Sequence, residues 1–139
     1  MEAWPSWIER YIGIPYIECD CWGLVCRIYA EQWGIALPPV PGPTQAARAS
    51  QLLEQEPDWQ AIDLQACRLG DVLALTLGGI PRHCGIVIRP GTMLHTMEGS
   101  GAGLERYNVP RWRLRCAGAY RHPQLATPDD PRLRSASPV

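Results

Sequence analysis

A chain of 139 residues is long enough for one domain with a substantial hydrophobic core and too short for two ordinary domains. Hydrophobic residues make up 46% of it and charged residues 19%, a balance that excludes wholesale disorder. The formal net charge of −1 removes the bulk electrostatic case for binding nucleic acid, and no apolar run approaches the roughly 18 residues of a membrane-spanning helix. We therefore expect neither nucleic acid nor membrane insertion.

The N-terminal segment has apolar residues at helical spacing and lacks the features of an export signal. Trp4, Trp7, Ile8 and Tyr11 recur on one side of a helix, which predicts a short amphipathic helix over residues 4–12. The segment has neither the basic start nor the long apolar stretch of a secretory signal. We therefore expect the protein to be made in the cytoplasm.

The residues after Asp20 predict a second helix, from Cys21 to about Trp33. Asp20 is a natural N-cap because its carboxylate can accept a backbone N–H of the first turn, and Gly34 is placed to end the helix. A thiol at the first helical position meets the positive end of the helix dipole, which favours thiolate over thiol. Cys21 is therefore the candidate nucleophile.

The rest of the chain predicts a loop, a surface helix and then a run of strands. Prolines in 38–43 indicate a rigid loop, and a surface helix is expected from Thr44 to Pro57. The strands that follow are separated by turns rich in glycine and proline, as in hairpins. The expected strands are Val72–Leu77, Cys84–Arg89, Met93–Met97 and Cys116–His122, with a fifth around Glu105–Val109.

Helices followed by an antiparallel meander are typical of an α+β domain. We expect N-terminal helices packed on an antiparallel sheet of about five strands, and we assign this domain to residues 1–122. Residues 123–139 are rich in proline and hold no aromatic residue. We expect them to form an extended or disordered tail.

The six cysteines admit three interpretations. A disulfide framework is disfavoured, because no export signal is visible and the core is large enough without cross-links. A zinc site is the stronger rival, although no CxxC pair occurs and a lone Cys-x-Cys is a weak signal. Its ligands would be Cys19, Cys21, His83, Cys84 and Cys116. The default for most of them is burial as small apolar side chains, so we expect no metal and no cofactor.

A thiolate nucleophile needs a histidine partner near neutral pH. His83 opens one expected strand and His95 lies in the next. Because side chains alternate along a strand, the two share a face only if the turn between them is odd in length or contains a bulge. The segment around Pro90 and Gly91 can supply either. The arrangement predicts Cys21 as nucleophile, His83 as general base and His95 as the residue that orients His83.

Four segments, in this order, resemble the NlpC-type cell-wall peptidases, a family of papain-like cysteine peptidases. They match the family's nucleophile helix, its Gly-Asp strand, its His-x-Gly-Ile strand and the strand of its third polar residue. The segments are DCWGLVCRIYAEQWGI (20–35), RLGDVLAL (68–75), HCGIVI (83–88) and MLHTMEG (93–99). The resemblance covers most of the chain, and it implies a papain-like fold with a Cys21–His83–His95 triad.

The resemblance also implies a substrate, the stem peptide of peptidoglycan, and cleavage after γ-D-glutamate next to a diamino acid. In the family a tyrosine hydroxyl near the nucleophile helps to stabilise the oxyanion, and Tyr16 is its counterpart here, with Asp20 as a second candidate for oxyanion or substrate binding. Only a short loop, Ile17–Cys19, separates the two. Several charged side chains are candidates for contacting the stem peptide or are simply solvated: Arg82, Glu98, Glu105, Arg106 and Arg111.

Further segments resemble the branch of the family found in tails of phages and of phage-like particles such as gene transfer agents. They are GIPY before the cysteine, GIALP after the helix and RWRLRCAGAYR near the end of the domain. This resemblance implies tail hub or tail-tip proteins as partners and a final location in the particle tail, acting on the periplasmic wall during DNA delivery. The alternative is a weakly active or inactive structural tail-tip subunit that docks on hub proteins.

Overall fold

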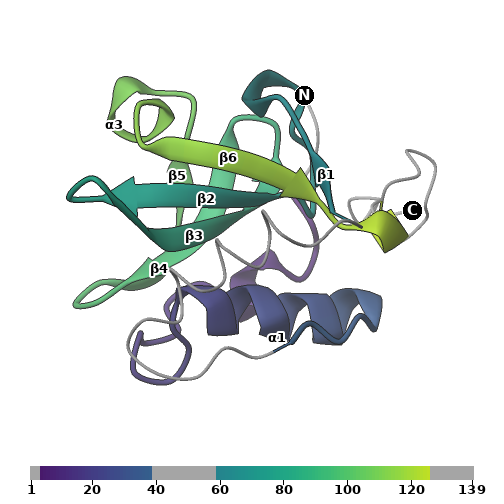
Figure 1. The fold of residues 1–139 in the computed structure, drawn as a ribbon. Helices are drawn as coiled ribbons and strands as arrows, with labels where there is room; N and C mark the ends of the chain where they lie inside the picture. The colour runs from purple at the N-terminus through teal and green to yellow at the C-terminus, as the bar shows by residue number, and fades with distance from the viewer. Residues whose placement is uncertain (1–3, 39–58, 126–139) are drawn as a thin grey trace.

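The computed structural model describes residues 4–38 and 59–125. Within them, six antiparallel strands form one sheet in the order β1-β6-β2-β3-β4-β5. Helix α1 (Cys21–Trp33) runs beneath the sheet, and the short helix α3 (Pro110–Arg113) lies on its other side (Figure 1). The strands are β1 (Gln60–Ala61), β2 (Val72–Leu77), β3 (Ile80–Arg89), β4 (Thr92–Met97), β5 (Gly101–Arg106) and β6 (Cys116–Arg121).

Helix α1 has the bounds that its local sequence signals predict. The Asp20 side chain accepts a hydrogen bond from the backbone N–H of Gly23 at 2.8 Å, and Gly34 ends the helix in the left-handed conformation (φ 65°). Gly23 is required beside this cap, because a Cβ there would lie 2.8 Å from Oδ1 of Asp20. The helix start, and with it Cys21, is therefore fixed by the Asp-Cys-x-Gly sequence itself.

Alternation along the strands gives the sheet two buried faces. The face under α1 is lined by Val72, Cys84, Ile86, Ile88, Leu94 and Ala102. The opposite face is lined by Leu73, Leu75, Val87, Met93 and Ala119, and Trp112 of α3 packs there. Each face therefore has its own hydrophobic core, and the sheet separates the two.

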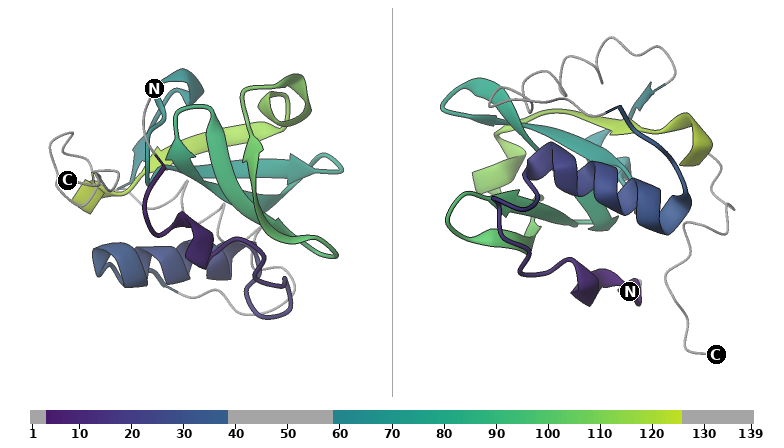
Figure 2. Two further views of the ribbon diagram at one scale, coloured as in Figure 1. Left: turned by 180° about the vertical axis from the view of Figure 1, so that it is seen from behind. Right: turned by 90° about the horizontal axis from the view of Figure 1, so that it is seen from below.

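The N-terminal segment is not the helix that its apolar spacing predicts over residues 4–12. Only one turn of 3-10 helix, η1 (Ile8–Arg10), forms there, beside α1 (Figure 2). Trp7 packs edge-on against Trp33 at 6.1 Å between ring centroids, and the Tyr11 hydroxyl donates to Glu31 at 2.7 Å. The spacing thus comes from side chains that pack on α1, and Pro5 and Gly13 leave too short a segment for a stable helix.

Most strands form where the sequence predicts them, but several have different bounds. Strand β2 has its expected bounds, β3 begins earlier than expected, at Ile80, and β6 ends at Arg121. Strand β5 covers Gly101–Arg106 rather than Glu105–Val109, and the short β1 was not expected. Both errors fall where strand pairing is long-range or glycine-rich, so that local propensity is weak. The helix expected from Thr44 lies outside the described residues.

Two contacts fix the start of β2, one to the end of β6 and one to α1. Asp71 and Arg121 form a buried bidentate ion pair, with N–O distances of 2.9 and 2.8 Å, that joins the start of β2 to the end of β6. The Tyr29 hydroxyl of α1 donates to the carbonyl of Gly70. The Gly-Asp sequence before β2 therefore has a structural role in this chain.

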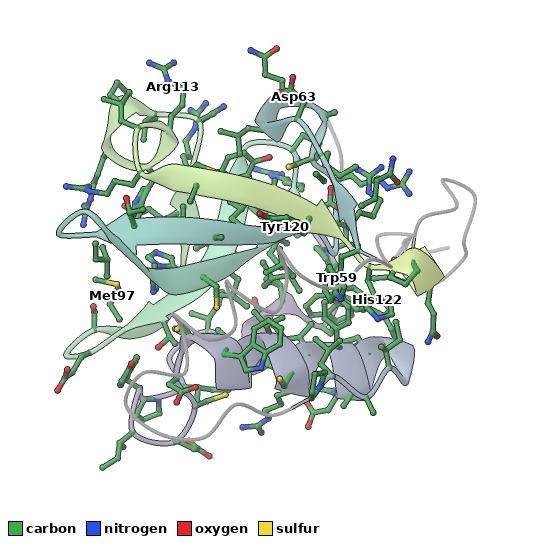
Figure 3. All side chains as sticks on the ribbon, viewed as in Figure 1. Trp59, Asp63, Met97, Arg113, Tyr120 and His122 are labelled. Carbon is green, nitrogen blue, oxygen red and sulfur yellow. The ribbon has the colours of Figure 1, made fainter. Side chains whose placement is uncertain are left out.

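The third histidine is part of an aromatic cluster. His122 lies edge-on to Trp59, with 4.8 Å between ring centroids, and close to Tyr29 (Figure 3). The segment after it, η3 (Pro123–Leu125), is ordered and buries Leu125, so the folded part continues past the expected boundary at residue 122. Residues 126–139 lie outside the described part, and the tail stays a prediction. None of the described helices has the length and apolar run needed to cross a membrane.

Candidate active site

Cys21 is the first residue of α1, where it is 3% exposed. The pKa of its thiol is lowered to about 5, first by hydrogen bonding to the side chain of Cys84 and then by hydrogen bonding and charge interaction with His83, which together outweigh burial. Its position at a helix N-terminus acts in the same direction. Cys21 is therefore the most readily ionised thiol in the described part of the chain.

The two histidines predicted from the sequence lie in contact, one behind the other. Nε2 of His83 is 2.8 Å from Nδ1 of His95, and both rings are buried. Nε2 of His95 is in turn 2.9 Å from Oε1 of Glu105. Cys21, His83, His95 and Glu105 thus form a line of hydrogen-bonding partners from α1 across β3 and β4 to β5.

A β-bulge places both histidines on one face of the sheet. Val87 pairs with Met93 and Arg89 with Thr92, so Ile88 is an extra residue in β3. Without it, the alternation of side chains would turn one of the two histidines toward α1. Of the two possibilities that the spacing of His83 and His95 allowed, a turn of odd length or a bulge, the structure has the bulge.

Gly85 allows the two histidine-bearing strands to approach. A Cβ at this position would lie 2.8 Å from Sδ of Met93 and 3.4 Å from Cβ of His95. Gly85 stands two residues after His83 and shares its face. The His-x-Gly sequence therefore makes room for His95 beside His83.

Residues of α3 contact the other carboxylate oxygen of Glu105. Oε2 accepts a hydrogen bond from the indole N–H of Trp112 at 2.6 Å and lies 3.4 Å from the guanidinium of Arg111. Burial raises the pKa of Glu105, but the hydrogen bonds from Trp112 and His95 outweigh it, so the pKa is lowered. Burial lowers the pKa of His95 and the charge of His83 lowers it further, which together outweigh the hydrogen bond with Glu105 that raises it. The site therefore ends on an ionised carboxylate.

The sequence prediction missed this role of Glu105, and that of Trp112. It considered Glu105 and Arg111 for contact with substrate, whereas the two pair with each other behind His95. The available signal was positional: Glu105 belongs to the strand next to His95, on the same face. Arg106 donates a hydrogen bond to Asn108 at the exposed surface. The Arg82 side chain lies outside the described residues.

Cys84, which the sequence analysis considered only as a possible zinc ligand, forms a hydrogen bond with Cys21. It follows His83 in β3 and faces α1, where it is 1% exposed, and its pKa is raised by the hydrogen bond with Cys21 and by burial. All six cysteines lie in the described residues and are free thiols, and Cys21 is the one whose pKa is lowered. The proposed zinc set is divided between the two faces, because Cys116 packs in the opposite core.

Tyr16 and Asp20 line an open groove of about 660 Å³ at the start of α1. Glu98 lines it from the other side. Burial raises the pKa of the Tyr16 hydroxyl, and the charges of Cys21 and Asp20 raise it further, so this hydroxyl lies in the field of the nucleophile. Ile17, in the short loop between them, is 96% exposed. The groove therefore adjoins the helix start at Asp20, and Cys21 itself is not among the residues that line it.

The segment before Tyr16 is fastened to the edge of the sheet. The backbone N–H of Gly13 donates to the carbonyl of Ala102 at 2.8 Å, and that of Ala102 to the carbonyl of Ile14 at 2.9 Å. Gly101 permits this approach, since a Cβ there would lie 2.9 Å from the Ile14 carbonyl oxygen. Tyr16 is thus placed by β5 rather than by the loop that follows it.

The NlpC/P60 family model matches residues 9–121 of this chain. Among curated relatives, murein DD-endopeptidase MepS/murein LD-carboxypeptidase of Escherichia coli K12 is 29% identical over 96 residues, which cover 69% of this chain and 45% of the relative. The same protein of E. coli O157:H7 matches equally. The chain thus spans less than half the length of the curated relatives it matches.

Solved structures share the fold. An NlpC/P60 family protein of Bacillus cereus superposes with a TM-score of 0.61 at 23% identity, over 82% of this chain and 37% of that one. A Staphylococcus aureus protein described as similar to a lipoprotein of the NLP/P60 family gives 0.56 at 23% identity, over 81% and 37%. The predicted papain-like α+β fold is therefore confirmed.

Proposed function

Because the chain belongs to the NlpC/P60 family, we propose that it is a cysteine peptidase that hydrolyses stem peptides of peptidoglycan. One observation carries the proposal: a helix-start thiolate, Cys21, interacts with His83, and His83 is backed by His95. This is the order of nucleophile, base and orienting group that amide hydrolysis through an acyl-enzyme requires. The likeness to a murein endopeptidase supports the substrate class.

The acylation step begins with the proton of Cys21 on His83. The thiolate adds to the carbonyl carbon of the scissile amide, and a tetrahedral oxyanion forms. As the C–N bond breaks, His83 gives its proton to the leaving amine and the acyl group remains on Cys21 as a thioester. The lowered pKa of Cys21 means that the attacking form is already present at neutral pH.

Deacylation reverses the direction of proton transfer. His83, now neutral, takes a proton from water as the water oxygen attacks the thioester carbon. The C–S bond then breaks, a carboxylic acid leaves, and the proton returns to the sulfur of Cys21. His95 holds the His83 ring in place through both steps, because it occupies the Nε2 side of that ring.

We assign oxyanion stabilisation to the start of α1 and to Tyr16. The backbone N–H of Cys21 lies at the positive end of the helix dipole, where negative charge is favoured. The Tyr16 hydroxyl stays protonated because its pKa is raised, and it can therefore donate a hydrogen bond to the oxyanion. Asp20, which caps the helix, and Glu98 give the groove an acidic lining that suits an amino group of the substrate.

The biological setting belongs to the same proposal. We propose that the bond cleaved joins γ-D-glutamate to a diamino acid, and that the protein acts on the periplasmic wall as a tail component of a phage or a phage-like particle. Its partners would be tail hub or tail-tip proteins, and it would open the wall locally during DNA delivery. The resemblance of the GIPY, GIALP and RWRLRCAGAYR segments to that branch supports this setting.

Digestion of purified peptidoglycan by reduced protein tests the function. The wild type is compared with Cys21→Ala, and released fragments are identified by mass. We expect fragments cut within the stem peptide with the wild type and none with Cys21→Ala, since the thioester cannot form. Absence of release by the wild type, across walls of several chemistries, would contradict the proposal and favour a structural tail subunit.

A further inference from the structure

Glu105 is fixed in orientation by contacts that leave one oxygen for His95. An indole N–H can only donate, so Oε2 of the carboxylate accepts the hydrogen bond from Trp112 at 2.6 Å, and Arg111 lies beside the same oxygen. Oε1 then faces Nε2 of His95 at 2.9 Å. Gly103 pairs with His95 across the strands, and Glu105, two residues further along β5, lies on the same face as the histidine.

This orientation determines which nitrogen of His95 carries the proton. An ionised carboxylate only accepts, so the proton of His95 is on Nε2. Nδ1 of a neutral His95 is then an acceptor, and it lies 2.8 Å from Nε2 of His83, which must donate. The remaining nitrogen of His83, Nδ1, is the one left for Cys21. One carboxylate thus sets the proton positions of both rings.

We propose that Glu105 is a positioning residue of the reaction: through His95 it keeps His83 in the form whose Nδ1 exchanges protons with Cys21, the leaving amine and water. The inference rests on the proposed roles of Cys21 and His83. In the reverse tautomer, His95 would donate from Nδ1, His83 would have to accept at Nε2, and its own proton would sit on Nδ1. A neutral His83 in that form cannot take a proton from water.

The substitution Glu105→Gln separates this role from a purely structural one. The side-chain amide is isosteric, but only its oxygen can accept from Trp112, so its NH₂ group turns toward His95. That NH₂ needs an acceptor at Nε2, which drives the proton of His95 to Nδ1. A carboxylate that served only to satisfy the Trp112 N–H would be replaced by the amide without effect on the histidines.

The first measurement is the tautomer of His95 by ¹⁵N NMR at neutral pH. In the wild type we expect a protonated Nε2 and an unprotonated Nδ1, and in Glu105→Gln the opposite. A wild-type His95 protonated on Nδ1 overturns the proposal. This result needs no variant, so the proposal stays testable even if Glu105→Gln fails to fold.

The second measurement is the rate of alkylation of Cys21 as a function of pH, read from the Cys21 peptide by mass spectrometry. Loss of the negative charge of the carboxylate destabilises a protonated His83. We therefore expect the pH profile of Cys21 alkylation in Glu105→Gln to move to higher pH, and the rate of wall hydrolysis to fall about 100-fold. Glu9→Gln, an exposed site on η1, is the matched charge control and should leave both unchanged. Unchanged profile and rate in folded Glu105→Gln overturn the proposal.

These readouts keep two failures apart. If the wild type releases no wall fragments, the proposed substrate is wrong, while the tautomer and the alkylation profile still test Glu105. Trp112→Phe keeps an aromatic ring beside both histidines but removes the donor to Oε2. We expect a smaller shift of the alkylation profile in the same direction. A Trp112→Phe profile shifted as far as that of Glu105→Gln would assign the effect to α3 packing and overturn the carboxylate's role.

Discussion

The two faces of the sheet differ in what their buried residues do. The face under α1 is apolar and holds the proposed nucleophile Cys21 with Cys84 among packed hydrophobic side chains. The opposite face holds a polar line, His83, His95 and Glu105, with Trp112 packed against both histidine rings. Both faces have an apolar core, but only the second also buries a line of titratable side chains, and the two faces meet where His83 and Cys84 follow each other in β3. Substitutions on the two faces should therefore have different consequences.

The largest effect is expected on the polar face. His83→Ala removes the proposed base, and we expect the rate of wall hydrolysis by the folded protein to fall about 10⁴-fold. Because His83 is buried and bonded to His95, its loss should also lower the thermal midpoint. The matched control is His122→Asn, a buried histidine in the aromatic cluster with Trp59, which should lower stability and leave the rate of the folded enzyme unchanged. Equal losses of activity in the two variants would contradict the division between the faces.

On the apolar face the expected cost is in stability. Ile28 is fully buried on α1, and Ile28→Ala should lower the free energy of unfolding by about 3 kcal/mol, through lost transfer energy and the cavity left behind. Ile28→Val should cost about 1 kcal/mol. Urea denaturation followed by tryptophan fluorescence measures both, and the folded fraction of each variant should hydrolyse peptidoglycan normally. If the hydrolysis rate per folded molecule also fell, residues on the α1 face would contribute to the chemistry as well as to stability.

Cys84→Ala tests the point where the faces meet. Because the hydrogen bond from Cys84 is the largest influence that lowers the pKa of Cys21 to about 5, removing it should raise that pKa. The thiolate is then lost at a higher pH as the solution is acidified, so alkylation of Cys21 at pH 6 should be slower than in the wild type. Cys26→Ala, on the same helix with a pKa raised to about 12 by burial, should not move the profile. A profile unchanged by Cys84→Ala would leave His83 alone responsible for the thiolate.

The smallest effect is expected at the cap of α1. Asp20→Ala removes the acceptor for the N–H of Gly23 and should destabilise the fold by about 1 kcal/mol, whereas Asp20→Ser keeps a cap and should cost less. Thermal denaturation of the two variants side by side measures the difference. If both cost the same, the capping hydrogen bond is not what holds the helix start.

Local signals in the sequence predict much of the fold and part of the candidate site. The bounds of α1, the bulge between the histidines and the meeting of His83 with His95 all follow from capping residues and side-chain parity, which depend on neighbours in the chain. The contacts that sequence reasoning missed are non-local. Glu105 reaches His95 through strand pairing, and Cys84 reaches Cys21 through packing of α1 on β3, neither of which a local pattern specifies.

The bulge at Ile88 also has a consequence for how the chain can vary. A strand offers a side chain only two directions, so the count of residues between His83 and His95 acts as a parity rule. With the tight turn at Pro90 and Gly91 kept, one residue inserted in β4 between Thr92 and His95 would carry His95 to the α1 side, whereas two would return it to its partner. Among proteins that keep this turn and this pair of histidines, the number of residues between the turn and the second histidine should therefore differ in even steps, or in odd steps offset by a gained or lost bulge.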